Sequence, residues 1–336
     1  MSDLSSSDLP SVSLALPVYN GEKFIVDAIR SILAQDHKNF ELIITDNAST
    51  DGTEKICRDF AASDQRVRYV RNERNLGAGP NYNLGFELSR GKYFKWCACD
   101  DRISEDFVSA SVASLEKNQD AVLAYGTTQT IDQNGRLVPL VGKMLGPQLA
   151  DDRPMRRFKK FLNDRNTNFE IFGLHRSAAL KNTTMHRSYY GSDKTLMAEL
   201  TLLGRFIFVP GITFYNREHP DRSINIWDKK DLARWIDTNA SGKPYRPNLQ
   251  RLGQLIEIAV RHREIVSPVK TLGAIFTWAL HPAQLGRCTA ELIGLVSPSA
   301  QLWLLRTARR LVNLTESGST RLLKSQMQNV PSAKPE

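Results

Sequence analysis

Two adjacent carboxylates, Asp100 and Asp101, directly follow a strand-like apolar run at residues 93–98, and Gly91 precedes that run as a turn residue. In an open α/β sheet, ligands bind at the carboxyl ends of the strands. Two acids placed there repel each other unless positive charge lies beside them. Paired oxygen ligands suit Mg²⁺ or Mn²⁺, which share their coordination shell with substrate phosphates. We therefore interpret the pair as metal ligands; the alternative is a helix cap followed by a surface acid.

A second set of polar residues follows two earlier strand-like runs. Residues 17–22, Pro-Val-Tyr-Asn-Gly-Glu, close the first run and open a helix, where backbone N–H groups can bind an anion. Tyr19 offers a ring on which a base can stack. The next run ends at Asp46 and Asn47, which lie beside Tyr19 if the two strands are neighbours. Neither a Gly-x-Gly-x-x-Gly motif nor a Walker loop is present, which argues against a dinucleotide or a P-loop nucleotide.

The elements that must position these residues alternate along the first third of the chain. Apolar periodicity predicts strands at 12–16, 40–45, 67–70 and 93–98, and helices at 22–35, 53–62 and 80–89. This alternation predicts parallel βαβ units and an α/β fold. The second half is less regular. It contains candidate strands at 121–125, 169–174 and 206–209, a hairpin turn at Asn134-Gly135, and a helix that begins at Asp193.

Charge is unevenly distributed. The 336 residues carry a net charge of +9, and residues 243–336 hold 13 Lys and Arg against 5 Asp and Glu, so the first 242 residues are nearly neutral. A basic tail on a neutral body indicates an anionic partner, which can be a membrane surface, a nucleic acid or an acidic glycan. The alternative is a helical face that only interacts with solvent.

Targeting signals and cysteines limit the compartment. Residues 1–10 lack the basic start and apolar core of a secretory signal and are interpreted as a flexible leader. No uncharged apolar run reaches the ~20 residues that span a bilayer. The four cysteines have no zinc-like spacing and fit reduced thiols. These features predict a cytoplasmic protein or one that is peripheral at the inner face of the cell membrane.

The motifs recur in one order in a known family. Residues 17–22 are followed by Ser-Ile-Leu-Ala-Gln at 31–35, Asp-Asn-Ala-Ser-Thr-Asp-Gly-Thr at 46–53, Asn-Leu-Gly at 75–77, Gly-Lys-Tyr at 91–93, and the Asp pair. From about Ser11 to Ile224 the chain resembles family 2 glycosyltransferases. The resemblance implies a GT-A fold with a mixed, mainly parallel sheet, a nucleotide-binding half at 11–101 and an acceptor half at 102–226. Residues 227–336 would then form a basic helical extension.

The resemblance also implies a reaction. It is the inverting transfer of a sugar from a nucleotide diphosphate sugar to a hydroxyl of a saccharide or lipid-linked saccharide, with Mg²⁺ or Mn²⁺, in envelope or extracellular polysaccharide synthesis. Pro17, Tyr19 and Glu22 fall where the family contacts the base and ribose. Asp46 and Asn47 fall at its uracil-reading acids, with an amide in place of the second acid. An amide can still pair with a pyrimidine edge, so uridine, thymidine and guanosine stay open.

The remaining assignments concern the metal and the base. Asp100 and Asp101 fall at the family's Asp-x-Asp region, with Ala98 where many members have the first acid. One of the pair ligates the metal, and the other helps to place the metal or the ribose. His219 lies where related enzymes carry His or Arg near the diphosphate and is the third candidate metal ligand; a structural histidine is the alternative. Asp193 matches the general base at the start of a late helix; capping that helix is the alternative.

The sequence leaves two questions open: what the tail contacts, and to which class of protein the chain belongs. Residues 301–313 form a predicted amphipathic helix, and Trp278 and Trp303 could settle at an anionic membrane surface. The alternative is packing on the catalytic domain or in a homodimer. A catalytically disabled GT-A-like protein could instead use the tail to bind membrane or nucleic acid, the latter being the less expected partner. A sugar nucleotidyltransferase is a further alternative, although residues 17–22 lack the glycine-rich basic loop it needs.

Overall fold

Two buried runs form the centre of a sheet. In the computed structural model, β1 (Val12–Val18) and β2 (Phe40–Asp46) are buried at every residue, as expected for strands covered on both faces. The structure describes residues 10–140, 142–145, 147–164, 167–226, 228–240, 245–297 and 299. The other strands are β3 (Val67–Arg71), β4 (Tyr93–Trp96), β5 (Arg102–Ile103), β6 (Ala121–Ile131), β7 (Leu137–Val138), β8 (Leu174–Arg176) and β9 (Arg205–Arg217).

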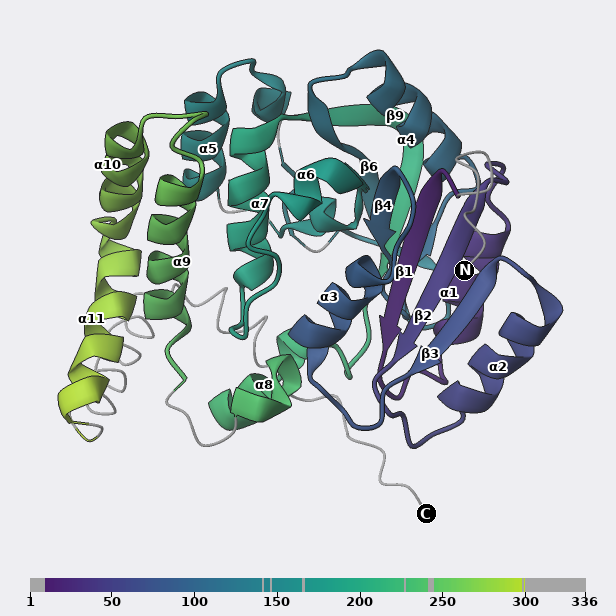
Figure 1. The fold of residues 1–336 in the computed structure, drawn as a ribbon. Coiled ribbons are helices and arrows are strands. Elements are labelled where there is room, and N and C mark those ends of the chain that lie inside the picture. The colour runs from purple at the N-terminus through teal and green to yellow at the C-terminus, as the bar shows by residue number, and fades with distance from the viewer. Residues whose placement is uncertain are drawn as a thin grey trace, which may run out of the picture. The chain divides into compact units, whose positions relative to one another are not determined.

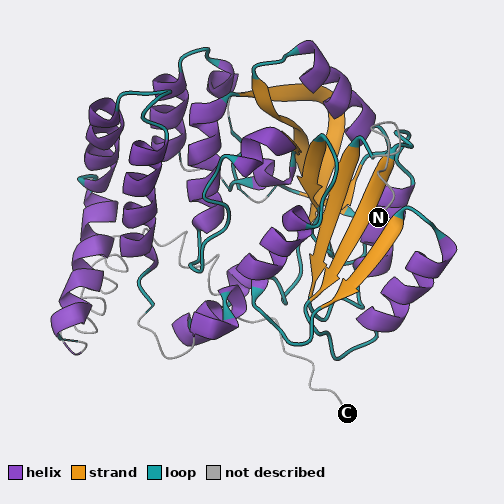
Figure 2. Ribbon diagram, viewed as in Figure 1, coloured by secondary structure: helices purple, strands orange, loops and turns teal. Residues whose placement is uncertain are grey.

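The sheet is mixed, and it is parallel across β1 to β4. Across the described residues, nine strands form one sheet in the order β3-β2-β1-β4-β8-β6-β9-β5, with β7 paired to β6 (Figure 2). The ladders among β1, β2, β3 and β4 are parallel, which confirms the predicted βαβ units. β8 runs antiparallel to both β4 and β6, whereas β6 and β9 are parallel. The predicted α/β class is therefore confirmed.

Helices cover both faces of this sheet. α1 (Ile25–Leu33), α2 (Thr53–Ser63) and α4 (Phe107–Lys117) share one apolar core with the alternate β1 residues Val12, Leu14, Leu16 and Val18. α3 (Ala78–Glu87) packs on the opposite face (Figure 1). Gly85 permits this close approach, because a Cβ there would lie 2.8 Å from the Cβ of Ala15.

The chain divides into two compact units, residues 1–278 and 279–336. α9 and nearly all of α10 belong to the first unit, and α11 belongs to the second. No helix in the described ranges is long and apolar enough to cross a membrane. The remaining helices are α5 (Pro154–Asn163), α6 (Ser177–Lys181), α7 (Ser192–Leu203), α8 (Lys229–Ile236), α9 (Pro247–Arg261), α10 (Pro268–Ala279) and α11 (Pro282–Val296), with short 3₁₀ turns η1 (Pro147–Ala150), η2 (Phe169–Phe172), η3 (Ser223–Asn225) and η4 (Thr238–Ala240).

Two sequence predictions are wrong here. The predicted strand at 169–174 is the 3₁₀ turn η2 followed by β8 from Leu174. Phe169 and Phe172, three residues apart, lie on the same side of this turn and pack on Phe214 at 6.2 and 5.2 Å between ring centroids. Trp278 is buried, with the Arg251 guanidinium 4.8 Å from its ring. The ring is therefore not accessible to a lipid interface. Residues 301–313 lie outside the described residues.

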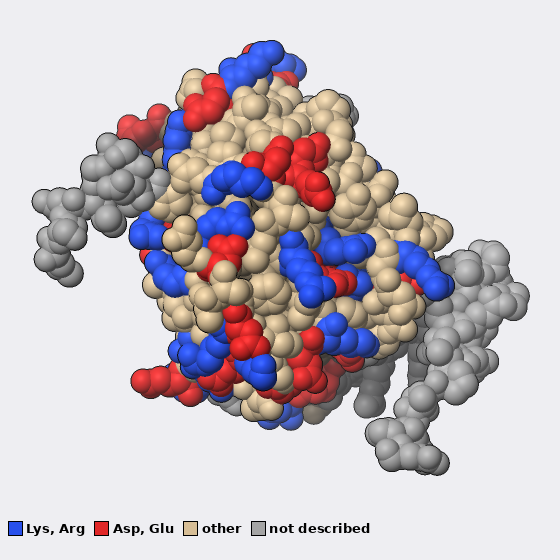
Figure 3. Space-filling view, turned by 90° about the vertical axis from the view of Figure 1, so that its right-hand side faces the viewer, with Lys and Arg blue, Asp and Glu red and all other residues tan. Residues whose placement is uncertain are grey.

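The side of the molecule that carries α2 shows acidic and basic groups interspersed (Figure 3). Pairs along α2 contribute to this mixture, with Lys55 2.6 Å from Asp59 and Arg58 2.8 Å from Glu54. Such exposed pairs add little to stability. A mixed surface also lacks the single-sign field that attracts nucleic acid, which agrees with the near neutrality of the first 242 residues.

Candidate active site

Two loops at the carboxyl ends of β1 and β2 are fastened to each other. Val18 pairs with Asp46 in the parallel ladder, so the loops that follow these residues are neighbours, as the sequence predicted. Gly52 N donates to Glu22 Oε2 at 2.6 Å, and Glu22 N donates to Asp51 Oδ2 at 3.1 Å. Tyr19 is left 47% exposed at the rim. The loops therefore form a fixed ledge with an open aromatic ring at its edge.

The ledge contains left-handed backbone at two non-glycine residues. Asn20 has φ of 52° and Ala48 has φ of 62°. Asn20 is held by its neighbours, because its N–H donates to Ser49 Oγ at 2.9 Å and its Oδ1 accepts from Thr50 N at 2.8 Å. Such conformations persist only where the surroundings determine them, and they concentrate at ligand sites.

Asp46 lies under the ledge and is completely buried. Its carboxylate accepts hydrogen bonds from Tyr69 OH at 2.5 Å, Arg71 Nη1 at 2.7 Å and Ser49 N at 2.9 Å. These bonds leave the carboxylate little remaining acceptor capacity. The visible consequence is a rigid loop, anchored on β3 through Arg71.

Asn47 is in a comparable position, 3% exposed and fully hydrogen-bonded. Its Nδ2 donates to Asn75 Oδ1 at 2.8 Å and to Gly77 O at 3.1 Å. Its Oδ1 accepts from Asn72 Nδ2 at 3.1 Å and from Leu76 N at 2.8 Å. Two donated and two accepted bonds are the full capacity of an amide. The amide that replaces the acid thus organises the 72–77 loop.

Asp100 and His219 are brought together although 119 residues separate them along the chain. His219 Nε2 lies 2.9 Å from Asp100 Oδ2, and the imidazole packs against the ring of Phe24. Among the described residues, His219 Nδ1 is buried without a hydrogen-bond partner. Because the two ring nitrogens lie on different sides of the imidazole, this nitrogen faces away from Asp100.

The Asp101 carboxylate is bonded to Arg217 and not to His219. Its Oδ1 accepts from Arg217 N at 2.8 Å, and the residue is 8% exposed. Burial and the Asp100 charge raise the pKa of Asp101 well above its ordinary value, against the opposing influence of the Arg217 N–H, Arg222 and Lys95. In the described parts of the chain no three His, Cys, Asp or Glu side chains converge on one point. Of the three predicted metal ligands, the structure brings together Asp100 and His219.

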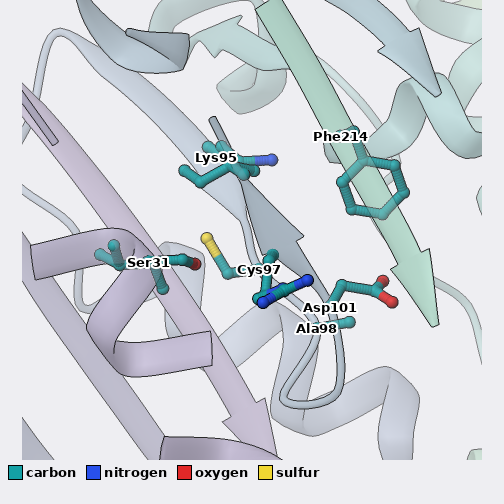
Figure 4. A pocket seen from close by; sticks show the side chains of 9 residues that line it. Ser31, Lys95, Cys97, Ala98, Asp101 and Phe214 are labelled. Carbon is teal, nitrogen blue, oxygen red and sulfur yellow. The ribbon is translucent and has the colours of Figure 1, made fainter. Parts of the chain in front are cut away.

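Behind Asp101 is a small pocket of about 10 Å³, room for one water. Lys95 and Asp101 extend to the same side of it, toward Phe214 (Figure 4). Lys95 is fully buried, donates to Phe172 O and lies 4.6 Å from the ring centroid of Phe107. Burial lowers the pKa of Lys95. The pocket is therefore part of the support for the Asp100–Asp101 turn and is far too small for a sugar.

Asp193 lies in the first turn of α7, which begins after Gly191 at φ of 90°. Asn168 Nδ2 donates to Asp193 Oδ2 at 2.7 Å. Asn168 is buried and adopts φ of 64°, a third left-handed residue at the site. The carboxylate is thus oriented by a side chain 25 residues earlier in the chain and faces the positive end of a helix.

Tyr82 and His186 connect the two acidic regions. Their rings are 5.6 Å apart, and His186 also lies 5.0 Å from the Trp96 ring. Burial, Cys99 and the Asp100–Asp101 pair raise the pKa of Tyr82, whereas burial lowers the pKa of His186 to about 4 against the opposing charge of Asp193. Tyr82 and His186 therefore form one aromatic cluster with Trp96.

Several of these residues were not identified from the sequence. Arg217 stood in the motif around His219, but its burial and its bonds to Asp101 Oδ1 and Asp100 O were not foreseen. Asn168, Tyr82 and His186 carry no local signal, because each reaches the site only through tertiary packing. The available hint was the concentration of Asn residues at 72–83, which are the amides around Asn47.

Comparisons with known proteins agree with this geometry. The family model "Glycosyl transferase family 2" matches residues 13–189, more than half of the chain. An uncharacterized glycosyltransferase of Rickettsia bellii is 35% identical over 139 residues, which cover 40% of this chain and 20% of that protein. The chondroitin synthase of Escherichia coli is 33% identical over 130 residues, 39% of this chain and 19% of that protein. The matched stretch thus spans about a fifth of each of these relatives.

The fold has solved counterparts. S. aureus TarS 1-349 in complex with UDP-GlcNAc superposes with a TM-score of 0.56 and 14% identity, covering 84% of this chain and 79% of that chain. At this identity the likeness concerns the fold alone. It supports the GT-A-like arrangement described above and extends it beyond residue 189.

Proposed function

This chain belongs to glycosyl transferase family 2, and we propose that it transfers a sugar from a nucleotide diphosphate sugar to a hydroxyl acceptor with inversion. The observation that carries the proposal is the presence of two acids that are each oriented by a side chain from a distant part of the fold. Asp193 is oriented by Asn168 at a helix start, and Asp100 is joined to His219. We assign Asp100 to the donor side and Asp193 to the acceptor side.

On the donor side, the ledge formed by residues 17–22 and 46–52 receives the nucleotide. Tyr19, the exposed ring, stacks on the base, and Pro17 and Glu22 shape the ledge around the base and ribose. Because the side-chain bonds of Asn47 are already used, we assign base recognition to the loop that Asp46 and Asn47 hold, more than to their own polar atoms. The choice among uridine, thymidine and guanosine then depends on backbone groups of that loop.

The metal site fits a divalent cation through two residues. Asp100 and His219 would hold Mg²⁺ or Mn²⁺ together with diphosphate oxygens, because Asp100 Oδ2 and His219 Nε2 lie 2.9 Å apart and would both face one ion. When bound, the ion supplies positive charge that stabilises the leaving nucleotide diphosphate. Asp101, held by Arg217 N, places Asp100 and is the positioning acid of the pair.

On the acceptor side, Asp193 acts as general base. As the acceptor oxygen bonds to the anomeric carbon, its proton passes to the Asp193 carboxylate, and the bond from that carbon to the diphosphate oxygen breaks on the opposite face. A single displacement of this kind inverts the anomeric centre. The name of the Escherichia coli relative, a chondroitin synthase, supports a saccharide acceptor in polysaccharide synthesis; a lipid-linked saccharide is the alternative acceptor.

A donor screen tests the proposal. Nucleotide sugars with uridine, thymidine or guanosine are offered with Mn²⁺, and release of nucleotide diphosphate is measured together with the thermal unfolding midpoint, which binding to the native state raises. We expect one nucleotide class to be turned over. If wild-type protein neither binds nor turns over any of these nucleotide sugars, the chain is a disabled GT-A-like protein.

Calorimetry of the matching nucleotide diphosphate, with and without Mn²⁺, tests the metal site. Asp100→Ala is expected to abolish the Mn²⁺ dependence of binding. Asp106→Ala, on an acid at the start of α4 that has no assigned role in the site, is the control and should retain it. Equal Mn²⁺ dependence in wild type and Asp100→Ala would remove Asp100 from the metal site.

A further inference from the structure

The loop at residues 183–191 leads directly into the helix that carries Asp193. Its conformation is strained, because Met185 has φ of 55°. On one side the loop is held by α3, where Asn83 Nδ2 donates to His186 O at 2.9 Å and His186 N donates to Asn83 Oδ1 at 3.1 Å. The position of this loop therefore determines where His186 and the start of α7 lie.

On its other side, the loop is bridged by one buried amide of α9. Gln254 is 5% exposed. Its Nε2 donates to Thr184 Oγ1 at 2.6 Å, and its Oε1 accepts from Tyr189 OH. The Tyr189 hydroxyl also lies 2.8 Å from Oγ1 of Thr195 in α7. Gln254 thus joins the two flanks of His186 to each other and, through Tyr189, to the helix turn after Asp193.

A buried carboxylate of α7 completes this network. Glu199 is fully buried and accepts from Thr184 N at 2.7 Å and from Thr184 Oγ1 at 2.6 Å. Its Oε1 lies 2.8 Å from Nε2 of His262, the residue after α9. A buried carboxylate is stable only when it is paired and hydrogen-bonded, so α7, the loop and α9 must adopt one joint arrangement.

Exposed contacts add to this arrangement at the rim. Arg187 Nη2 lies 2.8 Å from Oε1 of Glu257 in α9, and Tyr190 N donates to the hydroxyl of Tyr245 at 3.0 Å. Such exposed pairs contribute less than buried ones. The contacts nevertheless come from the same segment, residues 245–262, which follows the family-model match at 13–189.

We propose that α9 is a built-in positioning element of the active site, with Gln254 as the positioning residue that fixes the 183–191 loop and thereby the Asp193 base. The inference rests on the proposed function for the role of Asp193, but the loop contacts stand independently of it. The helix, at residues 247–261, lies after the family-model match at residues 13–189. The basic extension then begins with a segment that serves catalysis.

The reaction tolerates little displacement of its general base, which is why a positioning residue affects the rate. A general base must lie within about 2.6–3.2 Å of the proton it removes, and a displacement of about 1 Å can lower a rate roughly 10²-fold. When the Gln254 amide is removed, the Thr184 and Tyr189 hydroxyls lose their buried partner, and the strained loop relaxes. Donor binding should change little, because none of the hydrogen bonds described above for the ledge or for Asp100 involves Thr184, Tyr189 or Gln254.

Gln254→Met is the test, because it keeps the length of the side chain and removes both hydrogen-bonding groups. The matched control is Gln250→Met, one turn earlier in the same helix, where the side chain is exposed and no side-chain contact is described. The readouts are kcat and KM for transfer, nucleotide diphosphate affinity with Mn²⁺, and amide hydrogen exchange of residues 183–191. We expect Gln254→Met to lower kcat about tenfold or more, to leave donor affinity within about twofold, and to accelerate exchange in the loop.

The outcomes separate the two proposals. If wild-type protein turns over no nucleotide sugar, the proposed function fails, and hydrogen exchange alone decides the role of Gln254. If Gln254→Met matches Gln250→Met in loop exchange, the positioning role is overturned. It is also overturned if exchange increases while kcat of an active enzyme stays at the control value, because the loop would then be held without consequence for catalysis.

A second variant covers the case in which Gln254→Met does not fold. Tyr189→Phe removes a single hydroxyl from the same network without changing volume. It should lower kcat by a smaller factor at unchanged donor affinity and accelerate exchange near residue 189. In the double variant Tyr189→Phe/Gln254→Met the two effects should be less than additive, since they act on one bond. Wild-type kcat and loop exchange in Tyr189→Phe would contradict the proposal.

Discussion

The proposed donor edge and the proposed acceptor edge of this molecule are built in different ways. At the donor edge, the loops after β1 and β2 follow consecutive parallel strands, and the residues that fasten them lie within 20–22 and 46–52. At the acceptor edge, Asp193 depends on Asn168, on a strained loop and on Gln254 of α9. The ledge is thus built between two consecutive strand–helix units, whereas the surroundings of Asp193 are assembled from segments that extend from Asn168 to Gln254.

The largest effect is expected at the acceptor edge. Asp193→Asn preserves the size of the side chain and removes the proton acceptor, so transfer should fall by about 10²–10⁴-fold, the usual contribution of a general base. Nucleotide diphosphate affinity should stay at the wild-type value, because the donor edge is separate. Transfer kinetics and calorimetry on the same preparation measure both quantities.

Asp151→Asn, on an acid near α5 outside the site, is the control for Asp193→Asn. Comparable transfer by the two variants would mean that another group accepts the proton. A parallel loss of donor affinity in Asp193→Asn would mean that the two edges are not independent, and the comparison between them would have to be abandoned.

An intermediate effect is expected at the donor edge from Asn47→Asp. The carboxylate loses the donors to Asn75 Oδ1 and Gly77 O, so buried acceptors are left unpaired. We expect the free energy of unfolding to fall by about 2 kcal/mol, with weaker nucleotide binding and unchanged base preference. Denaturant unfolding and competition among nucleotides provide the readouts.

Asn134→Asp in the exposed hairpin turn is the matched control for this variant. Unchanged stability of Asn47→Asp, combined with a shift of preference toward one base, would show that side chain 47 reads the base directly. The donor edge would then owe its selectivity to a side chain and not to the loop that this amide organises.

The smallest effect concerns His175, which lies in β8 between the two edges. It is completely buried, its Nε2 lies 2.9 Å from Ile171 O, and burial lowers its pKa to about 4. In the unfolded chain the pKa is about 6.5. Above that pH His175 is neutral in both the folded and the unfolded state. As the pH falls, His175 gains a proton in the unfolded state but not in the folded state. The free energy of unfolding therefore decreases down to about pH 4.

Between pH 6.5 and 5.5 this histidine should therefore lower the unfolding free energy by about 1 kcal/mol. His175→Gln should flatten the pH dependence of denaturant unfolding in that interval, whereas His281→Gln, on an exposed histidine, should leave the slope unchanged. A wild-type slope in His175→Gln would mean that other groups dominate acid sensitivity.

The sequence sufficed for the proposed donor edge because its residues directly follow predicted strands. The alternation of apolar segments predicted β1 to β4 and their parallel order, and the strand ends located Tyr19, Asp46 and Asp100. The inward turn of Asp101 could not be predicted, because it depends on a backbone N–H 116 residues later. Nor could the 3₁₀ turn at 169–172, since Phe169 and Phe172 have a strand-like composition and only packing on Phe214 selects the turn.

The acceptor edge was foreseen at one residue. Asp193 stood out through its place at a helix start, but the residues that orient it did not. Asn168 and Gln254 are 25 and 61 positions away along the chain, and polar residues of these types have no periodicity that marks a tertiary contact. The role assigned to the tail from charge alone also missed that α9 belongs to the first compact unit.

The stereochemistry of the product tests the central claim most directly. The account holds that one displacement, with Asp193 as base, moves the sugar from donor to acceptor. Proton NMR of the product made from an α-linked nucleotide sugar reports the anomeric configuration through the coupling of the anomeric proton. The account predicts a β-linked product from the first turnover. An α-linked product would contradict a single displacement and, with it, the role of Asp193.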